Sequence, residues 1–235
     1  MILPVAVLAG GLATRLRPIT ERIPKSLVEV AGRPFVEHQI ALLRQQGIHD
    51  VVFCVGFLGE QVQDALGDGS RWSMRFRYSF DGAQLVGTGG ALRRALPMLG
   101  DAFFVLYGDS YLTCNFSDVA ESFRVAEQPA LMTVYRNDDQ FDRSNVRFEE
   151  GRIVRYDKIN RDPAMRHIDY GLGVLTPEAF APWLDRDEPL DLAVVYQQLV
   201  VRGALAGYEV TERFYEIGSP EGLAATEAFL TSHAS

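Results

Sequence analysis

The chain has 235 residues, of which 47% are hydrophobic, and a formal net charge of -8 at pH 7. This size suits one large domain with a full core, so we expect a single domain over 1–235. The acidic balance argues against a nucleic-acid partner, because nucleic-acid-binding proteins need a basic face. The two cysteines, Cys54 and Cys114, provide neither a disulfide framework nor a metal-ligand cluster.

Membrane insertion is not expected, because no apolar run approaches the roughly 20 residues that a spanning helix needs. The first apolar run is also too short for a signal peptide, and no basic region precedes it. We therefore expect a cytoplasmic protein without a membrane partner.

Short apolar runs alternate with helical patterns along the chain. Leu3–Leu8 predicts a buried strand, and Pro34 to Gln46 predicts a helix with Pro34 in its first turn. Further strands are expected at Val51–Val55, Arg75–Tyr78, Phe103–Tyr107, Leu131–Tyr135, Val146–Phe148, Ile153–Tyr156 and Ile168–Leu175. A short helix is expected after the strand Val51–Val55 and ends at about Leu66. Three more helices are expected, from Gly87 to about Leu96, near Asp191–Val201 and near Ser219–Leu230. This alternation predicts an α/β fold with a parallel sheet and helices on both faces.

A glycine turn and a group of cations follow the first predicted strand. Gly10 and Gly11 leave backbone N–H groups bare at the strand end, where an anion can sit. Four cations then fall within the next few positions: Arg15, Arg17, Arg22 and Lys25. On an acidic chain, this segment is where a phosphate-rich substrate is tolerated.

Two carboxylates lie at predicted strand ends. Asp109 follows the apolar strand Phe103–Tyr107, and Glu216 precedes a glycine and the predicted helix start at Ser219. Ligands of open α/β sheets bind beyond the carboxyl ends of strands, and Mg²⁺ prefers oxygen ligands. The alternatives are a turn-forming aspartate and a solvated glutamate.

Three other motifs carry weaker signals, namely Gly87-Thr88-Gly89-Gly90, Tyr156-Asp157-Lys158 and Asp169-Tyr170-Gly171. The first can let a ligand approach a helix start, or it can be a plain turn. The other two offer polar groups beside strands, or simple surface decoration. The four histidines show no spacing for nucleophilic catalysis or for zinc.

In chain order, these segments resemble the sugar-1-phosphate nucleotidylyltransferase family, the nucleotide-sugar pyrophosphorylases. The resemblance covers essentially the whole chain. Because no carboxyl-terminal β-helix or helical extension is expected, the chain most resembles the short, stand-alone bacterial members of the family. The resemblance implies a doubly wound, mostly parallel (Rossmann-like) sheet with helices on both faces and a small antiparallel lobe on the sugar side. It also implies a nucleotide-binding part over about 1–115 and a sugar-binding part over about 116–235. The matching stretches are Leu8 to Gly11 with Thr14 to Leu16, Pro24-Lys25, Gly87 to Gly90, Gly108-Asp109, Tyr170-Gly171 and Ile217 to Pro220.

The family's reaction is the Mg²⁺-dependent transfer of a nucleotidyl group from a nucleoside triphosphate to a sugar 1-phosphate, with release of pyrophosphate. The resemblance implies a guanylyl- or uridylyltransferase for a hexose, heptose or amino-sugar phosphate, working as a monomer or homodimer. It implies that Arg15, Lys25 and Asp109 are catalytic and that Asp109 and Glu216 bind Mg²⁺. It assigns the nucleotide to Leu8, Ala9, Gly10, Gly11, Gly87 and Thr88, and the sugar phosphate to Asn145, Asp157, Lys158, Tyr170 and Gly171.

Three positions depart from the family pattern. Ala13 stands where glycine is common, so we expect a negative φ there. Glu216 stands where many members have aspartate. The segment Ser79–Val86 has no clear match to the glutamine that uridine- and thymidine-using relatives place there, which leaves the choice of base open.

Two other classes of protein compete with this reading. One is a nucleotide-sugar-binding regulatory protein without catalysis, which the departures at Ala13 and Glu216 favour. The other is an NAD-dependent oxidoreductase, which the missing G-x-G-x-x-G motif disfavours.

Overall fold

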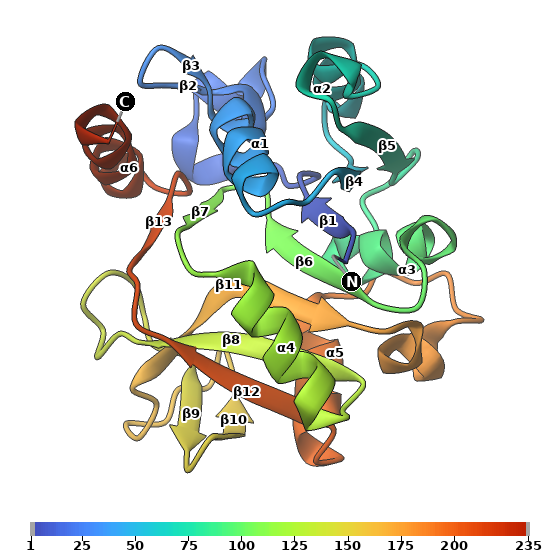
Figure 1. The fold of residues 1–235 in the computed structure, drawn as a ribbon, viewed down its shortest axis with the longest axis vertical. Helices are drawn as coiled ribbons and strands as arrows, with labels where there is room; N and C mark the ends of the chain where they lie inside the picture. The colour runs from blue at the N-terminus through green and yellow to red at the C-terminus, as the bar shows by residue number, and fades with distance from the viewer. Residues whose placement is uncertain (1–2, 234–235) are drawn as a thin grey trace.

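The computed structural model describes residues 3–233, and its centre is a sheet of nine strands (Figure 1). The strands lie in the order β5-β4-β1-β6-β11-β8-β12-β10-β9. Their bounds are β1 Val5–Leu8, β4 Asp50–Val55, β5 Arg75–Phe80, β6 Phe103–Tyr107, β8 Ala130–Arg136, β9 Val146–Glu149, β10 Arg152–Tyr156, β11 His167–Leu175 and β12 Leu205–Val210.

The first four strands of the sheet are parallel, and their order places a switch point between β1 and β6. Val5 of β1 pairs with Val51 of β4 on one side and with Phe104 of β6 on the other. The chain builds β4 and β5 outward from β1 and then crosses back to form β6. The carboxyl ends of β1 and β6 therefore adjoin at the place where open α/β sheets bind ligands.

The second half of the chain continues the same sheet with mixed pairing. Strand β11 is antiparallel to β6 and β8, whereas β12 is parallel to β8. Strands β9 and β10 pair antiparallel at the far edge. The prediction of an α/β fold with a mostly parallel central sheet is confirmed.

Helices cover both faces because side chains alternate along each strand. In β1, Val5 and Val7 face one core and Ala6 faces the other. The first core includes side chains of α1 Phe35–Gln45, α2 Gly59–Leu66 and α4 Phe116–Ala126, and the second includes those of α3 Gly87–Leu99 and α5 Leu192–Val201 (Figure 1).

A smaller unit lies beside the carboxyl ends of the central strands (Figure 1). Helix α6 Pro220–Ser232 packs on β13 Phe214–Glu216 and on the hairpin of β2 Glu29–Val30 and β3 Arg33–Pro34. Strand β13 pairs with β7 Ser110–Leu112, which follows β6 directly. This pairing brings the end of the chain back to the β6 end.

Sequence patterns place most elements close to their observed bounds but miss α4, β12 and the short strands β2, β3 and β7. Helix α4 carries a regular apolar stripe of Phe116, Val119, Ala120 and Phe123 that packs on the first core, and the predicted elements omit it. Strand β12 contains Gly207, which is out of place in an ordinary strand. There a Cβ would lie 2.6 Å from the ring of Phe148, so the glycine permits close packing. None of the helices in residues 3–233 is long and apolar enough to cross a membrane.

Candidate functional site

Two adjoining cavities lie at the carboxyl ends of β1 and β6. Cavity A has a volume of about 260 Å³ and cavity B of about 440 Å³. Tyr107 and Asp109 line both cavities, so the end of β6 forms their common wall. The geometry therefore offers two neighbouring binding spaces with one carboxylate between them.

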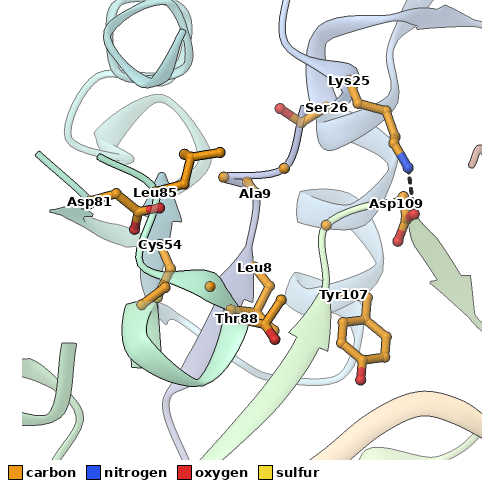
Figure 2. Close-up of a pocket in the computed structure, with 15 residues that line it drawn as sticks. Leu8, Ala9, Lys25, Ser26, Cys54, Asp81, Leu85, Thr88, Tyr107 and Asp109 are labelled. Atoms are coloured by element: carbon orange, nitrogen blue, oxygen red, sulfur yellow. Dashed lines mark hydrogen bonds and ion pairs between the residues drawn. The ribbon is translucent and has the colours of Figure 1, made fainter. Parts of the chain in front are cut away.

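All six residues that the resemblance assigns to the nucleotide line cavity A, which is shown in Figure 2: Leu8, Ala9, Gly10, Gly11, Gly87 and Thr88. The turn after β1 packs closely at Gly10, where a Cβ would lie 3.0 Å from the backbone nitrogen of Gly56. No atom lies within 4 Å of a Cβ built at Gly11, which leaves its backbone open to the cavity.

The glycine run at the start of α3 also has a packing role. Gly87 has a φ of +75°, and a Cβ there would lie 2.5 Å from the carbonyl oxygen of Leu190. The Thr88 hydroxyl donates to Asp191 Oδ1 at 3.2 Å and accepts from the Leu192 N–H at 2.9 Å. These contacts join the starts of α3 and α5. The packing of the two helices therefore accounts for part of the glycine run without any ligand.

Lys25 and Asp109 meet at the boundary between the cavities. Lys25 lies on a short 3₁₀ turn, Lys25–Leu27, and its Nζ donates to Asp109 Oδ2 at 2.6 Å (Figure 2). Both side chains line cavity A. Lys25 and the distant strand end thus meet at one pocket, whereas Arg15 lines cavity B and Arg17 and Arg22 line neither cavity.

Glu216 and Arg15 lie on the cavity B side of Asp109. Glu216 pairs with Ser110 across β13 and β7, and its carboxylate accepts from the Gly218 N–H and from the Ser219 hydroxyl. A Cβ built at Gly218 would lie 3.0 Å from Arg15 Nη2 and 3.3 Å from Asp109 Oδ2. Three charged groups therefore surround this glycine.

The carboxylates of Asp109 and Glu216 are the groups that could hold a divalent cation. Both supply oxygen, which Mg²⁺ prefers, and Mg²⁺ ordinarily binds one or two carboxylates together with waters and substrate phosphates. Across residues 3–233, no cluster of three or more His, Cys, Asp or Glu is arranged for a metal. The pair therefore fits a cation that arrives with a phosphate, rather than one caged by protein alone.

Four of the five residues assigned to the sugar phosphate line cavity B: Asn145, Lys158, Tyr170 and Gly171. Asp157 does not line it. Its carboxylate instead accepts from the N–H groups of Asn160 and Ile159 at 2.8 and 2.9 Å, and these hydrogen bonds lower its pKa. Asp157 is placed to shape the turn that carries Lys158.

Asp169 is a cavity B residue that the sequence assignment missed. Its Oδ2 accepts from the hydroxyls of Tyr107 and Tyr156 at 3.0 and 3.1 Å, and its Oδ1 accepts from the Gly171 N–H. Burial, and then the charge of Asp169, raise the pKa of both tyrosines, so their hydroxyls stay protonated. Asp169 stands in the motif Asp169-Tyr170-Gly171, of which only Tyr170 and Gly171 were assigned to the sugar phosphate.

The expectation of a negative φ at Ala13 is wrong. Ala13 has a φ of 48° and a ψ of 43°, in the left-handed region. Its carbonyl oxygen accepts from the Thr20 hydroxyl at 2.7 Å and from the Leu16 N–H at 3.1 Å. These hydrogen bonds offset the cost of roughly 1 kcal/mol that a Cβ carries in this conformation.

Several curated proteins are similar to this chain. An N-acetylmuramate alpha-1-phosphate uridylyltransferase from Neisseria meningitidis is 38% identical over 112 residues, which are 47% of this chain and 48% of that protein. The low-salt glycan biosynthesis nucleotidyltransferase Agl11 from Haloferax volcanii is 30% identical over 92% of this chain and 63% of its own length. A glucose-1-phosphate thymidylyltransferase from Streptomyces antibioticus is 31% identical over 89% and 61%. The chain spans about half to two thirds of the length of these relatives.

Solved structures share the fold. HddC from Yersinia pseudotuberculosis, complexed with GMP-PN, matches with a TM-score of 0.80 at 19% identity, over 97% of this chain and all of that one. The inositol-1-phosphate CTP transferase from T. maritima matches with a TM-score of 0.77 at 23% identity, over 98% and 95%. The model of the nucleotidyl transferase family matches residues 5–223. The chain therefore belongs to the nucleotidyl transferase family.

Proposed function

We propose that this chain is a Mg²⁺-dependent sugar-1-phosphate nucleotidylyltransferase. In the proposed reaction, a phosphate oxygen of the sugar 1-phosphate attacks the α-phosphorus of the nucleoside triphosphate. A new P–O bond forms there, the bond to the bridging oxygen of the β-phosphate breaks, and pyrophosphate leaves with that oxygen. An NDP-sugar remains. Such a reaction depends on in-line positioning and charge neutralisation more than on covalent catalysis.

The observation that carries the proposal is the position of Asp109, which lies between two cavities and contacts Lys25. We assign the nucleoside triphosphate to cavity A and the sugar phosphate to cavity B. The two phosphates that must react would then meet beside Asp109. The wall shared by the two cavities supports two substrates bound side by side rather than one ligand in one pocket.

The charged groups take separate roles in this proposal. Lys25 holds the α-phosphate and the incoming sugar phosphate together, and Arg15 neutralises the departing pyrophosphate. Asp109 and Glu216 hold Mg²⁺, which when bound neutralises charge on the reacting phosphate oxygens. Asn145 and Lys158 face the sugar phosphate. Their use as a sugar-phosphate site is supported by their common place in the wall of cavity B.

The direct test is pyrophosphate release, measured with Mg²⁺ and every pairing of four NTPs with a panel of hexose, heptose and amino-sugar 1-phosphates. Release with at least one pairing, and its loss on omission of the sugar phosphate, is the expected result. Tight nucleotide-sugar binding without release from any pairing would instead identify a regulatory binding protein.

A further inference from the structure

The loop that joins β8 to β9 supplies part of the wall of cavity B. It spans residues 137–145. Four consecutive residues at its end line the cavity, namely Asp142, Arg143, Ser144 and Asn145. A group that fixes this loop therefore also fixes part of the wall that we assign to the sugar phosphate.

The loop is braced across its middle by the side chain of Asn137. This residue is 1% exposed, and its amide nitrogen donates to the Asp142 carbonyl oxygen at 2.5 Å and to the Ser144 hydroxyl at 3.2 Å. Its Oδ1 accepts from the Phe141 N–H at 3.2 Å. Because these hydrogen bonds cross the loop, a contact made by Phe141 also restrains the residues that line cavity B.

Phe141 is the one hydrophobic residue of this loop, and its ring packs on the body of the protein. The ring centroid lies 6.0 Å from that of Phe214, edge to face, and 3.9 Å from the Cζ atom of Arg213. The ion pair between Arg166 and Asp138 also holds the loop, but both side chains are exposed. Exposed ion pairs contribute little, so the Phe141 contacts are the stronger anchor.

Arg213 directly precedes β13 and contacts a second aromatic ring there. Its Cζ atom lies 4.8 Å from the ring centroid of Tyr215, and that ring stacks on Phe229 of α6 at 4.0 Å. The Arg213 Nε atom is buried and, within residues 3–233, has no hydrogen-bond partner. Arg213 thus joins the loop after β8 to β13 and α6 by stacking, on one side of the sheet (Figure 1). A cation on an aromatic face gains more when it is withdrawn from water.

We propose that Arg213 is a positioning residue for the sugar-phosphate site. Arg213 lines neither cavity, so it acts through Phe141 and the loop. The inference rests on the proposed function for placing the sugar phosphate in cavity B. A ligand that binds only the ordered loop has an apparent affinity reduced by the fraction of molecules in which the loop is ordered.

The kinetic test is Arg213→Met, which keeps an apolar stem and removes the cation. We expect the KM for the sugar 1-phosphate to rise by about 5- to 10-fold, the scale of one desolvated cation–π contact. Saturating sugar phosphate restores the ordered loop, so kcat should change by less than about twofold. The KM for the nucleoside triphosphate should stay unchanged, because no residue of the loop lines cavity A.

Two further variants separate positioning from general stabilisation. Arg213→Lys keeps the charge but not the planar guanidinium, so its sugar-phosphate KM should fall between those of Arg213→Met and the unmodified protein. Phe141→Leu should raise the same KM, and adding it to Arg213→Met should cause little further increase. Effects that multiply in the double variant would show that Arg213 does not act through Phe141, and the proposal would fall.

The matched control is Arg71→Met. Arg71 also has its Cζ atom 3.9 Å from an aromatic ring centroid, that of Trp72, but it lines neither cavity. Both KM values of this variant should equal those of the unmodified protein. Thermal unfolding shows that each variant is folded, and Arg213→Lys and Phe141→Leu carry the test if Arg213→Met does not fold.

Hydrogen exchange tests the loop without any substrate. The N–H groups of Asp139, Phe141 and Ser144 are hydrogen-bonded within the loop. Peptides that contain them should exchange faster in Arg213→Met and at the original rate in Arg71→Met. Unchanged exchange in folded Arg213→Met would overturn the proposal.

Exchange and turnover together separate this inference from the proposed function. Faster exchange of the loop in Arg213→Met, with no pyrophosphate release by the unmodified protein from any substrate pair, would reject the transferase and keep Arg213 as the anchor of the loop. Pyrophosphate release with the same sugar-phosphate KM in folded Arg213→Met as in the unmodified protein would keep the transferase and reject the role of Arg213.

Discussion

The Nζ atom of Lys25 lies 2.6 Å from Oδ2 of Asp109, and these residues come from segments 84 positions apart. Both side chains line cavity A and remain partly exposed. An ammonium on a flexible stem can leave a carboxylate for a phosphate oxygen, whereas an arginine fork matches carboxylate geometry and is held more rigidly. Lys25 is therefore suited to exchange one anionic partner for another as substrates bind.

Replacing Lys25 with methionine should slow turnover by roughly 10²- to 10³-fold, because one preorganised contact to the reacting phosphates is lost. The fold should remain intact, since Asp109 is partly exposed and can be hydrated when its partner is gone. Steady-state pyrophosphate release measures the first effect and thermal unfolding the second. Arg124→Met, on the exposed face of α4, is the control and should leave turnover unchanged. Normal turnover by Lys25→Met would remove Lys25 from the mechanism.

The sequence predicts the frame of the site better than its details. Asp109 and the Gly10 turn follow strong apolar strands, so their place at adjoining strand ends follows from α/β topology. Asp157 is different, because its carboxylate is taken by N–H groups of its own turn. Ala13 adopts a positive φ because its carbonyl binds Thr20, a tertiary contact that local propensity does not contain.

The two glycines Gly87 and Gly11 line the same cavity but should respond differently to alanine. Gly87→Ala adds a Cβ 2.5 Å from the Leu190 carbonyl oxygen at a positive φ, so we expect about 1–3 kcal/mol less stability. Gly11→Ala meets no protein atom within 4 Å and should leave the free energy of unfolding nearly unchanged. Its methyl group should instead lower nucleotide affinity, because it lies on the open side of the turn.

Urea unfolding and equilibrium nucleotide binding, measured on both variants, separate the two effects. A Gly87→Ala variant as stable as the unmodified protein would show that the backbone between α3 and α5 can shift to accommodate the added methyl group. Unchanged nucleotide affinity in Gly11→Ala would show that the ligand does not approach this turn closely.

His38 gives the fold a pH dependence that is independent of the site. The ring is buried, its Nε2 donates to the Val30 carbonyl at 2.8 Å, and its Nδ1 accepts from Arg33 Nε at 3.2 Å. Burial lowers the pKa of His38 from 6.5, so the unfolded chain takes up a proton first as pH falls. Stability from this group is therefore present above pH 6.5 and is lost progressively below it, toward the lower folded pKa.

The corresponding measurement is the free energy of unfolding of the unmodified protein and of His38→Gln between pH 8 and pH 5. Glutamine does not titrate, so the variant should lose less stability on acidification. His49→Gln, at an exposed histidine, should follow the unmodified protein. Parallel pH profiles for all three proteins would contradict this assignment.

Glu216 is the most informative position for the proposed metal site, because its carboxylate already has two protein donors. It accepts from the Gly218 N–H and from the Ser219 hydroxyl, which orient it beside Asp109 and Arg15. A second lone pair on each oxygen remains for a cation. If Glu216 binds Mg²⁺, Glu216→Gln should raise the Mg²⁺ concentration for half-maximal turnover by about 10-fold or more, as loss of an orienting or ligating group commonly does.

Glu216→Asp distinguishes ligation from orientation at the same position. It keeps the charge but shortens the side chain by one methylene, so it should retain a lower Mg²⁺ requirement than Glu216→Gln if the negative charge attracts the cation. Thermal unfolding without Mg²⁺ reports how far each variant disturbs the packing of β13 on α6. An Mg²⁺ requirement equal in both variants and in the unmodified protein would leave Asp109 as the proposed protein ligand. The carboxylate of Glu216 would then serve to hold the Gly218 turn against Arg15.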